Sequence, residues 1–201
     1  MSFKAWFKSK TADKVLSPVR ELLIDLIAEN NIVLEVGCGT GDLLFRASDK
    51  IGSGLGVDLD QQMINFANDR KRQQNFEHIE FVNEDITSLT DLSDRRFDVS
   101  SSTLCLHEMR EEDAVSTLKT LAACSDRVLI ADYGVTESFW GKISIELDEL
   151  ISGHYGRFRH YRKVGRIPYL AKMAGLQLVS TIDTPIDGIK IWELGKPESQ
   201  P

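Results

Sequence analysis

Residues 33–41 read VLEVGCGTG, a short apolar stretch that runs directly into three alternating glycines. The apolar residues predict a buried β-strand, and the glycines predict a tight turn between that strand and a helix. Glycine has no Cβ atom, so the backbone can turn sharply there and approach a ligand closely. The segment is therefore interpreted as a nucleotide-binding turn, with a turn that holds no ligand as the alternative.

The residue after the third glycine narrows the choice of ligand. A dinucleotide-binding fingerprint would place glycines at positions 37, 39 and 42, with the pyrophosphate at the helix N-terminus. Position 42 is Asp in this chain. A carboxylate there would repel a pyrophosphate and would suit a cationic or zwitterionic ligand. This residue argues against an NAD-dependent oxidoreductase, which stays the second enzymatic interpretation.

Apolar periodicity predicts that strands and helices alternate along most of the chain. The predicted strands cover 32–36, 54–58, 79–82, a segment beginning at Phe97, and 127–132. The predicted helices cover 17–27, 42–47, 61–72 and 114–123. Such alternation is typical of right-handed βαβ units, which build a parallel sheet.

The C-terminal part of the chain follows a different pattern. Two β-rich runs, 176–182 and 189–194, are separated only by residues 184–188 and their flanks. This connection is too short for a crossover helix, so the two runs are predicted to form an antiparallel hairpin.

The motif at 35–41, the order of elements and the terminal hairpin together resemble the class I S-adenosylmethionine (SAM) dependent methyltransferases. The similarity is to the bacterial group that includes ubiquinone, menaquinone and many small-molecule methyltransferases, and it extends over about residues 17–195. It implies a Rossmann-like α/β fold, with a mostly parallel seven-stranded sheet and helices on both faces. Residues 1–201 are expected to form a single domain, in which residues 1–16 are an N-terminal lid or extension.

The resemblance implies SAM as the cofactor and S-adenosylhomocysteine (SAH) as the product. Ligands of open α/β sheets bind beyond the carboxyl ends of the strands, so the expected contacts follow those ends. The predicted cofactor-binding residues are Glu35, Gly37, Cys38, Gly39, Gly41, Asp58, Leu59, Met63, Asp85, Ile86, Ser102 and Thr103.

Among these residues, Asp58 is expected to accept hydrogen bonds from the ribose hydroxyls. The family pattern places Leu59 and Met63 against adenine and Asp85 near the adenine amine. Two alternatives stay open, because Met63 could be ordinary core and Asp85 could cap a turn.

Methyl transfer from a sulfonium proceeds by in-line displacement and depends mostly on positioning the acceptor. A general base is needed only for an acceptor that must lose a proton, and His107 is the candidate. An orienting or structural histidine is the alternative. A module that binds SAM or SAH without transferring the methyl group is the alternative to an enzyme.

The segment 153–163 concentrates histidine, tyrosine and cationic residues. The predicted acceptor-binding residues are His154, Tyr155, Arg157 and Arg159 of this segment, together with His107 from the segment after the fourth strand. They suggest a small-molecule acceptor that is planar or anionic, and a solvated helix edge is the alternative. The chain lacks the Asn-Pro-Pro-Tyr type of tetrapeptide after the fourth strand, which argues against methylation of adenine or glutamine amides.

Composition limits the other classes of function. The net charge of −7 and the pI near 5.2 argue against a nucleic-acid partner, since nucleic-acid binding needs a basic face. No apolar run is long enough to span a bilayer. The three cysteines have neither disulfide-framework nor zinc spacing, and no metal is expected. The expected protein is a cytoplasmic monomer or homodimer.

Overall fold

The computed structural model describes residues 12–88, 95–135 and 155–197. They contain one seven-stranded sheet with the order β3-β2-β1-β4-β5-β7-β6. The first five strands are parallel, and β7 is antiparallel to both β5 and β6, which confirms the predicted sheet and its terminal hairpin. The strands are β1 (Ile32–Val36), β2 (Ser53–Val57), β3 (Ile79–Val82), β4 (Phe97–Thr103), β5 (Ser125–Tyr133), β6 (Gln177–Asp183) and β7 (Ile189–Gly195).

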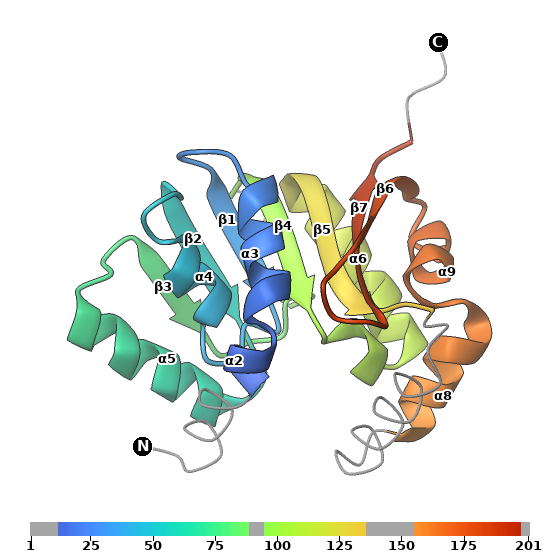
Figure 1. The fold of residues 1–201 in the computed structure, drawn as a ribbon, viewed down its shortest axis with the longest axis horizontal. Coiled ribbons are helices and arrows are strands. Elements are labelled where there is room, and N and C mark those ends of the chain that lie inside the picture. Colours follow the sequence, from blue (N-terminus) through green and yellow to red (C-terminus); the bar gives the residue numbers. More distant parts are fainter. Residues whose placement is uncertain (1–11, 89–94, 136–154, 198–201) are drawn as a thin grey trace.

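Helices cover both faces of this sheet (Figure 1). On one face α3 contacts α4 and β5, and on the other α6 contacts α9, β4 and β5. The helices are α2 (Ala12–Val15), α3 (Ser17–Leu26), α4 (Asp42–Ala47), α5 (Gln61–Gln74), α6 (Glu111–Cys124), α8 (Tyr155–Val164) and α9 (Arg166–Met173), with a 3₁₀ turn η2 (Leu106–Glu108).

Local sequence explains where several helices begin and end. Pro18 lies in the first turn of α3, where its missing N–H is not needed. Asp60 caps α5 by accepting a hydrogen bond from the backbone N–H of Gln62 at 2.9 Å. Asn75 ends the same helix in the left-handed conformation, which asparagine tolerates better than most residues.

The core lies along the central strands, where nearly every side chain is buried on both faces. Its largest fully buried side chains include Leu34, Leu129 and Ile130 from the sheet and Phe158 from α8. This packing holds the carboxyl ends of β1 to β5 rigidly at one edge of the sheet, which we call the carboxyl edge. The loops that leave the carboxyl edge carry the predicted site.

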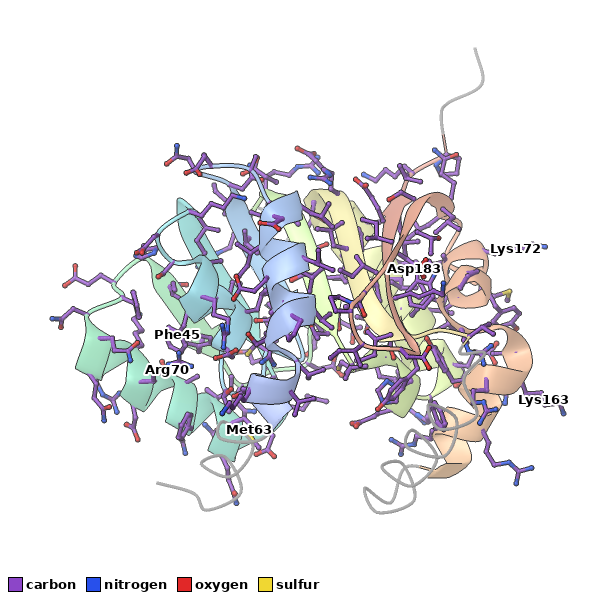
Figure 2. The ribbon with its side chains drawn as sticks, viewed as in Figure 1. Phe45, Met63, Arg70, Lys163, Lys172 and Asp183 are labelled. Carbon is purple, nitrogen blue, oxygen red and sulfur yellow. The ribbon has the colours of Figure 1, made fainter. Side chains whose placement is uncertain are left out.

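The C-terminal hairpin consists of β6 and β7, and β6 is an edge strand of the sheet. Its pairing with β7 shifts register between Leu178 and Ser180, as in a β-bulge. Leu178 and Val179 are exposed there. Asp183, at the end of this strand, is labelled in Figure 2.

Candidate active site

Three glycines shape the turn that follows β1. Gly37, Gly39 and Gly41 all adopt the left-handed region, with φ of 70°, 53° and 75°. A Cβ atom on Gly37 would lie 2.4 Å from the Sγ atom of Cys105, and one on Gly41 would lie 2.5 Å from the ring of Phe81. Both the backbone conformation and the close packing therefore require glycine, and the turn presents bare backbone at the carboxyl edge.

Cys38 is buried between these glycines. A Cβ atom on Gly56 of the neighbouring β2 would lie 2.9 Å from the Cys38 Sγ atom. The Cys38 side chain thus packs into the sheet, and only the backbone of this residue faces the turn.

Asp58 follows β2 directly and joins it to the glycine turn. One of its carboxylate oxygens accepts a hydrogen bond from the Gly39 N–H at 2.8 Å, and the other accepts one from the Asp60 N–H at 2.8 Å. Each oxygen has a second lone pair, so the carboxylate keeps capacity for further donors. The fold therefore brings together the acidic residue and the glycine turn that sequence analysis singled out separately.

The residues expected near adenine have different environments. Leu59 is 71% exposed beside Asp58, whereas Met63 on α5 is buried. Asp85 accepts hydrogen bonds from the backbone N–H and the hydroxyl of Thr87, so it caps the turn after β3. Ile86 is buried in the main core. Adenine contacts by these four residues stay predictions, and the capping interpretation of Asp85 gains support.

Glu35 on β1 is a buried acid below the glycine turn. Burial raises its pKa to about 8; Arg20 opposes this shift, and the negative charges of Asp42, Asp13 and Asp58 add to it. Its Oε2 atom has no hydrogen-bond partner within the described part of the chain. A buried polar atom without a partner is costly and is often explained by a function or a ligand.

Two further buried hydroxyls near the end of β4 lack partners among the described residues, those of Ser102 and Thr103. Glu35 is the register partner of Ser101, so Thr103 lies two residues further along the same face as Glu35. Polar atoms with unused hydrogen-bonding capacity therefore lie in the last residues of two adjacent strands, at the carboxyl edge.

Asp42 does not have the role expected of it. Its buried carboxylate accepts hydrogen bonds from Arg20 at 2.9 Å, Arg46 at 2.6 Å and Arg70 at 3.3 Å. Arginine hydrogen bonds and charges lower its pKa although burial acts in the opposite direction. The charge is neutralised within the protein, so the argument that Asp42 selects a cationic ligand was wrong. The Arg70 guanidinium also lies 4.4 Å above the Phe45 ring, and Figure 2 labels both residues.

His107 lies in η2, just after β4, and pairs with Asp132 at the end of β5. Its Nδ1 atom is 2.6 Å from Asp132 Oδ1, and its backbone N–H donates to Asp132 Oδ2 at 3.3 Å. The imidazole is only 2% exposed. It packs against the rings of Tyr133, Phe158 and Tyr161. Within the described part of the chain, the pair therefore packs against a cluster of aromatic rings, and the His107 Nε2 atom lies 3.9 Å from Glu108 Oε1.

Tyr161 completes this cluster from α8. Its hydroxyl donates to the backbone carbonyl of Tyr133 at 2.9 Å. Burial raises the pKa of Tyr161 well above its ordinary value, and the negative charge of Asp132 adds to the shift. The hydroxyl therefore stays protonated and acts as a hydrogen-bond donor.

The expected acceptor-binding residues separate along α8. Arg157 and Arg159 are exposed, and Arg157 donates to the backbone carbonyl of Glu108 at 2.9 Å, next to His107. The aromatic side chains of Phe158 and Tyr161 point into the core instead. His154 lies outside the described residues, and Tyr155 is described only as the first residue of α8.

Sequence analysis missed one distinctive residue here. Leu104 joins β4 to η2 with a φ of 48°, in a region that non-glycine residues seldom adopt. Its N–H donates to the Ala131 carbonyl at 2.8 Å, which holds the strained turn in place. Nothing in the sequence marks this leucine, and such strain is concentrated at functional sites in proteins generally.

No described helix is both long and apolar enough to cross a membrane. No group of three or more His, Cys, Asp or Glu side chains in the described ranges could hold a metal ion.

Comparison with known proteins finds similarity to methyltransferases. Residues 33–126 match the family model described as a methyltransferase domain. The putative methyltransferase 235L of Invertebrate iridescent virus 6 is 33% identical over 82 residues, which are 40% of this chain and 28% of that protein. A second curated relative is covered over 30% of its length, so the chain spans less than a third of either relative.

Solved structures agree on the fold. The magnesium protoporphyrin IX methyltransferase of Synechocystis PCC 6803 superimposes with a TM-score of 0.62 at 15% identity, covering 92% of this chain and 79% of that one. The O-methyltransferase NcsB1 from neocarzinostatin biosynthesis gives 0.66 at 19% identity, covering 94% of this chain and 57% of that one. At such identities the likeness shows a shared fold.

Proposed function

We propose that this chain, whose residues 33–126 match a methyltransferase domain, transfers the methyl group of SAM to a small-molecule acceptor. The observation that carries this proposal is the hydrogen bond from the Gly39 N–H to the Asp58 carboxylate. Gly39 is the middle one of the three left-handed glycines. A carboxylate and bare main-chain groups at one edge of a parallel sheet suit a nucleoside. Two of the similar structures support SAM as the cofactor, because the magnesium protoporphyrin IX methyltransferase and NcsB1 were both solved with SAM bound.

The residues present fit SAM. The glycine turn presents main-chain groups without side chains at the carboxyl edge, and Asp58 keeps lone pairs for ribose hydroxyls. Leu59 offers an exposed apolar surface for adenine. The unpartnered oxygens of Glu35 and Thr103 would meet the methionine end, whose amino group is a hydrogen-bond donor. When bound, SAM supplies a methyl group that is already activated by its sulfonium.

The protein then contributes mainly position, because no covalent intermediate is needed. We assign His107 to positioning, since its imidazole is held by Asp132 and packs against three aromatic rings. In this role it fixes the turn after β4 against the end of β5. Direct proton transfer by His107 is the competing assignment, and it would require the acceptor to reach a buried ring.

For the acceptor we propose a planar or anionic small molecule. Exposed Arg157 provides a cation next to η2, and Arg159 is a second exposed cation on α8. NcsB1, one of the similar structures, was solved with 2-hydroxy-5-methyl naphthoic acid, an aromatic carboxylic acid. An arginine guanidinium suits such a ligand, because it can stack on a ring and can pair with a carboxylate.

Two measurements test the function. SAH at about 100 times its dissociation constant should raise the free energy of unfolding by about 2.7 kcal/mol, and NAD should leave it unchanged. Methyl-labelled SAM incubated with a metabolite extract should then transfer label to an extractable small molecule. Binding without any labelled product would support the non-catalytic module, and stabilisation by NAD alone would support the oxidoreductase.

A further inference from the structure

Asp13 of α2 lies against the glycine turn, although it is far from that turn in the sequence. Its Oδ2 atom accepts a hydrogen bond from the Thr40 hydroxyl at 2.5 Å, and its Oδ1 atom accepts one from Arg20 Nη1 at 3.0 Å. All three side chains are almost completely buried. The segment before α3 is thus joined directly to the predicted cofactor loop.

The same arginine holds the other side of the turn. Arg20 Nη1 also donates to Asp42 Oδ2 at 2.9 Å, and Asp42 begins α4. Thr40 and Asp42 are the two neighbours of Gly41, whose φ is 75°. Asp13 and Arg20 therefore clamp the residues on both sides of a left-handed glycine, and α2 and α3 supply the clamp.

The hydrogen bond between the Thr40 hydroxyl and the Asp13 carboxylate is buried and has a charged acceptor. Hydrogen bonds to a charged acceptor are shorter and about twice as strong as those between neutral groups. Without Asp13, the Thr40 hydroxyl would have no described acceptor, and Arg20 would lose one of its two acids. Such a buried network stabilises one arrangement of the loop only while every partner is present.

We propose that Asp13 is a positioning residue for the cofactor, acting through Thr40 and the glycine turn. This inference rests on the proposed function, because it assumes that the turn binds SAM and SAH. Linkage then requires a reciprocal effect, in which cofactor binding strengthens the docking of α2 on the turn.

The test measures SAH affinity by calorimetry in the full chain and in the variants Asp13→Asn, Thr40→Val and the double variant. Asp25→Asn, at an exposed position on α3, is the matched control. Each single variant should bind SAH about ten-fold more weakly, since a charged hydrogen bond is lost. The SAH affinity of the double variant should equal that of the single variant with the lower affinity, because both substitutions act on the same hydrogen bond.

Hydrogen exchange supplies a second readout that a purely structural role would not move. In the parent, saturating SAH should slow exchange of the amides in residues 12–20. In Thr40→Val, which keeps the carboxylate and its pairing with Arg20, that slowing should be lost. This variant also serves if Asp13→Asn does not fold.

The outcomes separate the two proposals. If the parent binds no SAH, the proposed function fails. If the parent binds SAH and Thr40→Val binds it equally well, with the same slowing of exchange, then Asp13 has no positioning role and the inference is overturned.

Discussion

His107 and Asp132 form a buried pair, with 2.6 Å between Nδ1 and Oδ1, at the point where β4 and β5 both end. A second hydrogen bond, from the His107 backbone N–H, uses the other carboxylate oxygen. Since a carboxylate accepts, Nδ1 carries the proton and the ring orientation is fixed. Two adjacent strands are thereby tied together directly beside the predicted position of the acceptor.

We expect His107→Asn to lower the free energy of unfolding by about 1 to 3 kcal/mol, because it removes the imidazole donor to the buried Asp132 carboxylate, which keeps only the backbone N–H groups of His107 and Tyr133. Urea unfolding measures this. His160→Asn is the matched control, since His160 also pairs with a carboxylate, that of Glu111 at 2.6 Å, but at an exposed position. Equal stability of the two variants would contradict a structural pairing of His107.

Once an acceptor is known, the pH profile of turnover separates the two roles of His107. A positioning residue predicts that Asp132→Asn lowers kcat and leaves the shape of the profile unchanged. A general base predicts that the acidic limb of the profile moves or disappears. The second result would return His107 to direct proton transfer.

Asp58→Asn should remove most of the stabilisation that SAH gives to the parent, about 2.7 kcal/mol at 100 times the dissociation constant. The amide presents only one acceptor oxygen where the carboxylate presents two, and it carries no charge. Asp183→Asn, whose side chain is 84% exposed on β6, is the control and should respond to SAH like the parent. An undiminished response of Asp58→Asn would contradict the ribose contact.

Gly41→Ala should weaken or abolish SAH binding and should destabilise the fold. The added methyl would meet the Phe81 ring at 2.5 Å, and φ at this position is 75°. Gly156→Ala is the matched control, because a Cβ there meets nothing within 4 Å. Since Gly156 lies in helix α8, its replacement should stabilise the protein by about 0.5 to 1 kcal/mol. Thermal unfolding with and without SAH would show whether the two substitutions differ as expected.

Glu35 should make the stability of the protein without cofactor fall as pH rises. Its pKa of about 8 lies above the ordinary 4.5, so the folded state keeps a proton that the unfolded chain has lost. Between these pH values the free energy of unfolding should fall by about 1.4 kcal/mol per pH unit from this group, and above about pH 8 the contribution is constant.

Glu35→Gln removes this titration, so the slope should flatten and the variant should be the more stable protein at pH 8. Urea unfolding of both proteins at pH 5.5, 6.5, 7.5 and 8 measures the slope and compares their stabilities at pH 8. Glu29→Gln, at an exposed position, should keep the slope of the parent. A parent whose stability does not fall over this range would show that Glu35 is ionised in the fold.

Periodicity was sufficient to predict most of the sheet. Strands that are buried on both faces read as apolar runs, so β1 and β3 were placed with the bounds that the structure has. The predicted fourth strand was marked only at Phe97, because the serines that continue β4 are not apolar although they are buried. Helix α9 was not predicted, since the break before it depends on Gly165 and a left-handed Arg166.

The site was predictable only where chemistry leaves a local mark. The glycines and Asp58 stand out by spacing, and the fold joins them. The partners of His107, Asp42 and Thr40 come from distant parts of the chain, so no local pattern could reveal them. Because its partners could not be seen in the sequence, Asp42 was interpreted as a free charge that selects a cationic ligand. In the structure three arginines neutralise that charge.

The register shift in β6 has a consequence for solubility. A flat edge strand with exposed leucine and valine would act as a template on which further chains could stack into fibrils. The offset between Leu178 and Ser180 twists this strand out of plane and interrupts the regular row of donors and acceptors that a newcomer would need. Deletion of the extra residue there should therefore promote amyloid-like assembly even where it strengthens the hairpin itself.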